Sequence, residues 1–282
     1  MPAFHWWRTV FWLIPAISVY TLVLGAVSLA SMLVDRRGHV AHGCARVWSR
    51  LILVTTGVRV HAGGGGHVEP GRSYVFVSNH QSIYDFPILI TSIPFQLRIL
   101  AKASLGAFPV LGWHLRYTGH LLVDRARTGR ATLNRVGAMI RRGHSLIVFP
   151  EGTRSRDGRV GPFKRGLFLL AIDAGIPVVP VALSGTRHVM RKGRLTTCPG
   201  EVGIVLHEPL RTEGLARTDA TRLAERARDI IAATVAEREG DPTDRVAPKD
   251  PAAKAGPRAA SGAPGDVPAV TRGARRERTA GR

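Results

Sequence analysis

Cysteine is scarce in this sequence. Only two cysteines occur among 282 residues, Cys44 and Cys198, and they are too few and too far apart for a disulfide framework or a metal knuckle. No cluster of histidine and cysteine has the spacing of metal ligands. The sequence therefore favours a catalytic domain in a reducing compartment and predicts neither a metal ion nor a bound cofactor.

Acidic residues are also few, with 20 Asp and Glu against 40 Lys and Arg, which gives a formal net charge of +20. Such a balance predicts an anionic partner: nucleic acid, anionic lipid or a phosphorylated substrate. A hydrophobic content of 45% argues against a disordered basic protein. Between Arg98 and Arg165 the chain has fourteen Lys and Arg and three acids, so the positive field is strong in this region.

Charge is absent from Thr9–Val34, a run long enough to cross a bilayer core or to enter it as a helix bent at Pro15. A cleaved signal peptide is the alternative, but its apolar region spans only about 7–15 residues. We therefore predict a retained membrane anchor. Only Arg8 precedes the run, whereas Arg36, Arg37, Arg46 and Arg50 follow it. The bias places the remaining chain on the cytoplasmic side of the cell membrane.

Residues 44–57 favour a second helix, with Arg46 and Arg50 one turn apart and the apolar side chains largely elsewhere. An interfacial helix at the bilayer surface fits this pattern, and so does an ordinary amphipathic helix packed on the domain. After Gly240 the sequence consists mainly of Pro, Ala, Gly and charged residues, which predicts a disordered basic tail. We therefore divide the chain into an anchor with interfacial helix (1–57), a catalytic domain (58–239) and the tail (240–282).

The catalytic domain alternates short β-rich runs with segments of helical length. Glycines 63–66 are expected to form a flexible turn. Such alternation predicts an α/β fold with a mixed, largely parallel sheet flanked by helices. The expected strands are 73–79, 97–101, 120–124, 145–150, 178–184 and 202–208, and the expected helices are 128–142, 163–174 and 218–239.

"VSNHQSIYDFPIL" (77–89) places His80 and Asp85 five residues apart between an apolar β-type run and a helical one. Within one helix these side chains would point about 140° apart. If His80 lies in the turn and Asp85 in the first helical turn, the carboxylate can orient the imidazole, which then acts as a general base. Asp85 as a helix N-cap is the structural alternative. No G-x-S-x-G nucleophile motif occurs, so we expect the base to activate a hydroxyl of the substrate.

"FPEGTRSR" (149–156) follows another expected strand, at the edge of the sheet where α/β proteins bind ligands. Gly152 permits a tight turn, and Arg154 can present a bidentate fork to a phosphate. By itself this segment fits a structural, salt-bridged loop equally well.

Together these motifs resemble those of the glycerolipid acyltransferases, most closely the 1-acylglycerol-3-phosphate acyltransferases. Between and after "NHQSIYD" and "FPEGTRS", four further stretches match the family in order and spacing. The resemblance covers roughly residues 50–210. One departure is His120, where the family commonly has an apolar residue; we interpret it as structural. The matching stretches are "AKASLGAFPVLGW" (101–113), "GHLLVDR" (119–125), "FKRG" (163–166) and "IPVVPVAL" (176–183).

The resemblance implies a membrane-bound enzyme that acylates lysophosphatidate to phosphatidate, with acyl-CoA or acyl carrier protein as donor. His80 would be the base and Asp85 its orienting group. Arg154, with Lys102 and Arg125, would bind the acceptor phosphate, on a loop formed by Glu151, Gly152 and Thr153.

Two alternatives remain. One is an acyltransferase of the same mechanism that acts on another lysolipid, such as a lyso-aminolipid. The other is a basic, membrane-anchored binding protein that is not an enzyme, for which nucleic acid would be the candidate ligand. The sequence has no recognition helix or RNA-binding signature, so nucleic acid is not expected as a partner.

Overall fold

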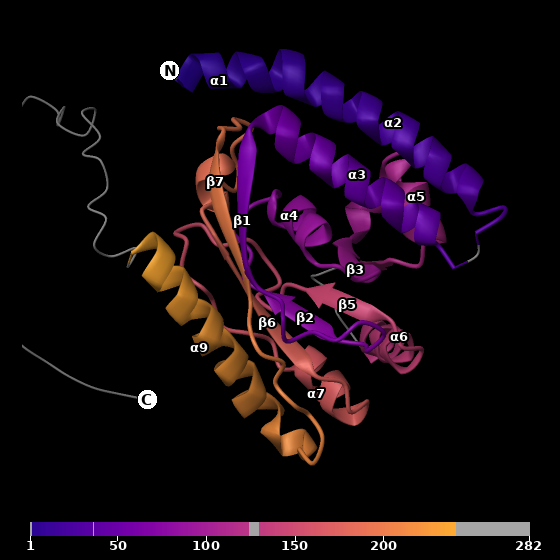
Figure 1. Ribbon diagram of the computed structural model, residues 1–282, viewed down its shortest axis with the longest axis vertical. Helices are drawn as coiled ribbons and strands as arrows, with labels where there is room; N and C mark the ends of the chain where they lie inside the picture. Colours follow the sequence, from indigo (N-terminus) through magenta and orange to yellow (C-terminus); the bar gives the residue numbers. More distant parts are fainter. Residues whose placement is uncertain (1, 36, 124–129, 241–282) are drawn as a thin grey trace, which may run out of the picture. The chain divides into compact units, whose positions relative to one another are not determined.

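The computed structural model describes residues 2–35, 37–123 and 130–240. A seven-stranded sheet has the order β1-β7-β6-β2-β5-β3-β4, and all neighbours run parallel except β6 and β7 (Figure 1). The predicted fold class, a mixed and largely parallel sheet with flanking helices, is confirmed. The strands are β1 (Val58–Gly64), β2 (Val75–Ser78), β3 (Leu97–Lys102), β4 (Leu121–Val123), β5 (Ser145–Val148), β6 (Val178–Ser184) and β7 (Gly200–Leu206).

Helices cover both faces of the sheet. Alternate residues of β2 enter two different cores: Phe76 faces α3, α4 and α5, whereas Val75 and Val77 face α6, α7 and α9. Central strands covered on both faces are buried along their whole length, which explains their continuous apolar sequences. The longer helices here are α3 (His39–Thr56), α4 (Asp85–Ser92), α5 (Leu111–Tyr117), α6 (Arg130–Arg141), α7 (Gly166–Asp173) and α9 (Ala220–Glu239). Short helical segments are η2 (Ala103–Ala107), α8 (Thr186–Val189) and η3 (Arg217–Asp219).

Strand β1 was not expected, and the prediction of a flexible glycine turn at 63–66 is wrong for its first half. Gly63 and Gly64 end β1, which pairs with β7 at one edge of the sheet. An edge strand tolerates polar residues such as Arg59 and His61, so it lacks a continuous apolar pattern. Gly64 has φ 73°, and a Cβ there would collide with the backbone of Leu206. Glycine at this position therefore reflects close contact between two strands.

The N-terminal apolar run is helical from Pro2 to Ser31. It consists of α1 (Pro2–Arg8), a π-helical turn η1 (Thr9–Leu13) and α2 (Ile14–Ser31). Pro15 is the second residue of α2, which directly follows the π-helical turn η1, and the chain stays helical through it. In the described part of the chain, Phe4–Ser31 is the one helix long and apolar enough to cross a membrane, with mean hydropathy 2.1. Length and composition alone are weak evidence for a span.

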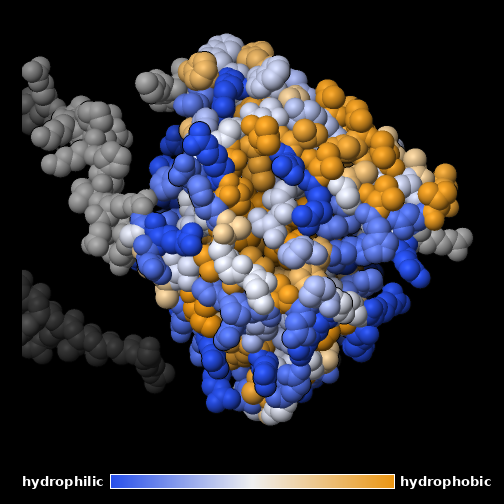
Figure 2. Space-filling model, viewed as in Figure 1, coloured by the Kyte–Doolittle hydropathy of each residue, from blue (hydrophilic) through white to orange (hydrophobic). Residues whose placement is uncertain are grey.

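One side of this helix is attached to the domain. The Tyr20 hydroxyl lies 3.0 Å from Thr55 Oγ1, and the Ser28 hydroxyl lies 2.7 Å from Nδ1 of His114. A Cβ on Gly25 would collide with the side chain of Val110. The opposite side exposes large apolar residues, and in Figure 2 hydrophobic side chains gather along α2. The exposed residues include Phe4, Trp7, Phe11, Trp12, Leu22 and Val23.

Residues 44–56 belong to α3, which lies between α2 and the domain (Figure 1), and Gly57 caps its end. Ile52 and Leu53 are 5% exposed and enter the core beside α4. Of the two interpretations of this segment, the structure has the helix packed on the domain. Residues 1–57 do not separate from the catalytic domain as a unit of their own. The predicted tail lies beyond the described residues, apart from Gly240.

Candidate active site

His80 lies in the turn between β2 and α4, and Asp85 is the first residue of α4. Nδ1 of His80 is 2.7 Å from Oδ2 of Asp85, so the predicted hydrogen bond is present. The same oxygen accepts the backbone N–H groups of Gln81 at 2.7 Å and Ser82 at 2.9 Å. Asp85 is fully buried. It therefore fixes the turn that precedes the helix and does not act as the N-cap, a position held by Tyr84.

The imidazole of His80 is held in one orientation from two directions. The carboxylate at Nδ1 favours the tautomer with hydrogen on that atom, which leaves the lone pair on Nε2. The ring of Phe149 stacks on the imidazole, with centroids 4.0 Å apart and planes inclined by 16°. This contact was missed from the sequence, although Phe149 begins the second motif. An oriented imidazole with a free nitrogen is the arrangement that a general base requires.

The loop 149–161 is joined to the His80 turn through backbone hydrogen bonds. Gly152 has φ 75° and makes the sharp turn expected of it. The N–H of Ser155 donates to the carbonyl oxygen of His80 at 2.7 Å, and Nε2 of Gln81 donates to the carbonyl of Gly158 at 3.0 Å. The two motifs, some seventy residues apart in sequence, thus form one structural unit at the carboxyl ends of β2 and β5.

Glu151 was predicted to shape the substrate loop, and its contacts show how the loop is attached. Oε1 accepts the N–H of His80 at 2.9 Å and Oε2 accepts that of Gly161 at 3.2 Å. Burial raises the pKa of this carboxyl, while the two N–H donors act in the opposite direction. Glu151 therefore connects the backbone of His80 to the backbone of the loop. In the described part of the chain, its carboxylate makes no hydrogen bond to the imidazole ring.

Thr153 and Arg154 lie in the outer part of the loop, with Thr153 exposed and Arg154 half-buried. Nζ of Lys192 donates to Thr153 Oγ1 and to the carbonyl of Arg154, both at 2.8 Å. A second lysine, Lys164, lies over the turn, because a Cβ on Gly152 would be 3.0 Å from its Nζ. Two lysine side chains, Lys192 and Lys164, therefore lie against the loop that carries Arg154. Neither lysine was singled out from the sequence.

The other predicted phosphate ligands are not placed in contact with this loop. Lys102 is exposed at the carboxyl end of β3, at the same edge of the sheet. Strand β3 pairs with β5, the strand that leads into the Arg154 loop, and lies about 10 Å at the backbone from β2, which leads to His80. Arg125 lies outside the described residues. The grouping of Lys102 and Arg125 with Arg154 stays a prediction.

Residues 59–184, which include both motifs, match the family model described as Acyltransferase. This part of the chain is therefore similar to the acyltransferase family. Within the solved structures, it is similar to the 1-acyl-sn-glycerophosphate (LPA) acyltransferase PlsC from Thermotoga maritima, with 28% identity and a TM-score of 0.76. That alignment covers 85% of this chain and 98% of the other.

The matches to curated relatives cover only part of this chain and part of each relative. The chloroplastic 1-acyl-sn-glycerol-3-phosphate acyltransferase BAT2 of Brassica napus is 38% identical over 139 residues, which are 48% of this chain and 40% of the relative. The human 1-acyl-sn-glycerol-3-phosphate acyltransferase alpha is 35% identical over 175 residues, 61% of this chain and 62% of the relative. The chain thus spans less than two thirds of the length of these relatives.

His120, the departure from the family pattern, contacts the backbone of β3. It is half-buried, and its Nδ1 accepts the N–H of Ile99 at 3.2 Å. Burial lowers the pKa of this imidazole well below its usual range, because a charged ring would lose its hydration. A neutral ring can accept the hydrogen bond that an apolar side chain could not. This agrees with our interpretation of His120 as structural.

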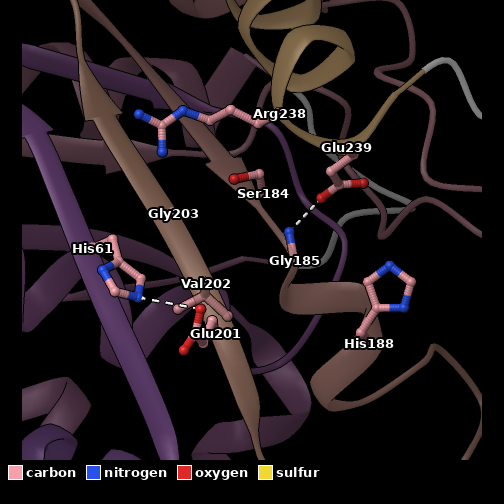
Figure 3. Close-up of a pocket in the computed structure, with 9 residues that line it drawn as sticks. All are labelled: His61, Ser184, Gly185, His188, Glu201, Val202, Gly203, Arg238 and Glu239. Atoms are coloured by element: carbon pink, nitrogen blue, oxygen red, sulfur yellow. Dashed lines mark hydrogen bonds and ion pairs between the residues drawn. The ribbon is translucent and has the colours of Figure 1, made fainter.

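A pocket of about 320 Å³ lies beside β6 and β7, near the end of α9, and is separate from the His80 turn (Figure 3). The N–H of Gly185 donates to the carboxylate of Glu239 there, and His61 faces Glu201 at 3.6 Å. Its lining residues include both acids and bases and none of the predicted site residues. Among the described residues, no group of three or more His, Cys, Asp or Glu side chains is arranged to hold a metal ion.

Proposed function

We propose that the protein transfers an acyl group from acyl-CoA or acyl carrier protein to the free sn-2 hydroxyl of 1-acylglycerol 3-phosphate, giving phosphatidate for phospholipid synthesis. The observation that carries the proposal is the His80–Asp85 pair, held by Phe149 and joined to the Arg154 loop. A base beside a cationic loop suits an acceptor with both a hydroxyl and a phosphate. The names of the relatives support the same reaction.

His80 begins the reaction. Nε2 takes the proton of the acceptor hydroxyl as its oxygen attacks the carbonyl carbon of the donor thioester. The tetrahedral intermediate then collapses, the carbon–sulfur bond breaks, and the imidazolium returns the proton to the departing thiolate. Asp85 stabilises the imidazolium that exists between the two transfers. Arg154 offers a planar fork to the phosphate, and the surplus of Lys and Arg in this region attracts both anionic substrates.

The exposed side of α1–α2 supports association with the membrane. The charge bias of the sequence leads us to propose that the catalytic domain lies on the cytoplasmic side of the cell membrane. Because Tyr20 and Ser28 are hydrogen-bonded to α3 and α5, a fully spanning helix would carry polar parts of the domain into hydrocarbon. We therefore favour a helix that lies in the surface layer of the membrane. Its lipid-facing position would bring the site to the acceptor, which is itself a membrane lipid.

A thiol-release assay with purified protein, acyl-CoA and lysophosphatidate tests the proposal. The His80→Ala variant is expected to lose about 10³-fold in kcat, a typical contribution of a general base. His67→Ala is the matched control, because His67 is half exposed and only approaches Glu208 at 4.0 Å. Near-normal turnover by His80→Ala would refute the base assignment. A parent protein that prefers a lyso-aminolipid to lysophosphatidate would refute the proposed acceptor.

A further inference from the structure

Lys192 makes the closest side-chain contact with the outer part of the Arg154 loop. It follows α8, in the segment that connects β6 to β7, and its side chain is half-buried. Its ammonium donates at 2.8 Å to the hydroxyl of Thr153 and at 2.8 Å to the carbonyl oxygen of Arg154. A hydrogen bond from a charged donor is stronger than one between neutral groups. Lys192 thus fixes the peptide group that directly follows the Arg154 side chain.

The segment 186–198, which carries Lys192, is itself attached on both sides of the lysine. Before it, the carbonyl of Met190 accepts the hydroxyl of Ser82, which belongs to the His80 turn. After it, the N–H of Thr197 donates to Thr9 Oγ1 at 3.0 Å, and Arg8 donates to the Thr197 carbonyl at 3.1 Å. The backbone around Lys192 is therefore held by the base-containing turn at one end and by the N-terminal helix at the other.

The peptide group that Lys192 holds is also bonded to the base. Its carbonyl belongs to Arg154 and its N–H to Ser155, and this N–H donates to the carbonyl oxygen of His80. A rotation of this peptide would break one or both contacts and would redirect the guanidinium of Arg154 relative to Nε2. Such contacts between loops of one domain set the distance between a phosphate ligand and a base.

We propose that Lys192 is a positioning residue for acceptor binding, which acts by holding the Thr153–Arg154 backbone so that the Arg154 guanidinium faces a phosphate on the substrate. The inference rests on the proposed function, because it assumes a phosphorylated acceptor. It predicts an effect on the acceptor and little effect on the thioester donor.

The test compares Lys192→Met and Lys192→Arg with the parent. Lys192→Met is expected to raise the KM for lysophosphatidate about tenfold, the usual loss when a charged hydrogen bond is removed, with kcat and the donor KM changed less than about twofold. Lys192→Arg should recover part of the loss, because it keeps a charged donor of different shape. Arg191→Met is the matched control, since Arg191 is the exposed neighbour on the same segment.

Limited digestion with trypsin gives a readout that needs no activity. Cleavage after Arg154 and Arg156, followed by mass spectrometry, should be faster in Lys192→Met than in the parent or Arg191→Met, because the loop is released. If the parent does not acylate lysophosphatidate, the proposed function fails, and the digestion still tests the positioning role. An unchanged acceptor KM in Lys192→Met, or equal losses for both substrates with a lowered Tm, would overturn the inference.

Discussion

Phe149 shows how an apolar side chain can contribute to an acid–base site. Its ring stacks on one face of His80 and leaves the edge with Nε2 free. In Phe149→Leu the apolar volume is largely kept and the stacking is lost. Since such ring contacts contribute about 0.5–1.5 kcal/mol, we expect kcat to fall about tenfold with both KM values little changed. Steady-state kinetics with lysophosphatidate and acyl-CoA measure this.

Phe95→Leu is the comparison for this variant. Phe95 packs against Tyr74 and Phe76 in the core, with ring centroids 5.7 Å apart in each case. Its replacement should lower Tm and leave kcat intact. If Phe149→Leu and Phe95→Leu behave alike, Phe149 only contributes to packing.

The candidate site was partly predictable at the level of residues. His80 and Asp85 could be paired because a β-run and a helical run fix the turn between them, so a five-residue spacing becomes a short distance. Glu151 could be placed near the site but not given its contact, since a carboxylate that accepts backbone N–H groups has no sequence pattern. Lys192 was missed for a similar reason. Its partners lie 38 and 39 residues away, and only the fold brings them together.

Two glycines in the paired helices α2 and α3 differ in their surroundings. A Cβ on Gly25 of α2 would collide with Val110, a non-glycine residue with φ 63°, whereas a Cβ on Gly43 of α3 would meet nothing within 4 Å. We expect Gly43→Ala to stabilise the protein by about 1 kcal/mol through helix propensity. Gly25→Ala should destabilise it by about 1–3 kcal/mol, because α2 must move away from Val110.

Thermal unfolding in detergent measures both changes under the same conditions. The pair is well matched, since each variant adds one methyl group inside a helix. Opposite shifts in Tm support the packing of α2 on the domain. A stabilised Gly25→Ala would mean that α2 does not rest on Val110 in solution.

Among the elements, burial decides which ones the sequence reveals. Strands β2, β5 and β6 are buried on both faces and give unbroken apolar runs, which made them easy to predict. β1 has one buried residue, Val58, contains the exposed Arg59 and His61, and ends in glycine. It is a strand because β7 offers an unpaired edge, and that condition cannot be read locally. From the sequence, α3 could be interpreted as a helix at the bilayer surface, because α2 had been assigned to the membrane. In the structure α2 covers the side of α3 that faces away from the core.

A group of half-buried histidines makes the stability of the molecule sensitive to acid. Burial, together with the nearby charge of the Arg98 guanidinium, lowers the pKa of His42 in α3 and of His114 in α5 to about 4. The unfolded chain takes up these protons near pH 6.5. Between pH 6.5 and 4 unfolding therefore binds protons, so stability must fall as the pH decreases through this range.

Tm measured between pH 7.5 and 5 should decrease, and it should decrease less steeply in His114→Gln. The amide of that variant can still bond to the Ser28 hydroxyl, which contacts His114 in the parent, but it cannot titrate. His67→Gln serves as the exposed control and should follow the parent. A Tm that stays level to pH 5 would contradict the assignment of these histidines as neutral.

The pairing of β1 with β7 joins the first strand of the sheet to the last, with Val58 opposite Gly200. During translation, the stretch between them takes roughly ten seconds to emerge from the ribosome. For that interval the nascent chain displays an apolar helix while the sheet that supports it is unfinished. The helix can therefore reach a bilayer before the domain closes, so the surface on which this protein works is also a surface on which it can complete its folding.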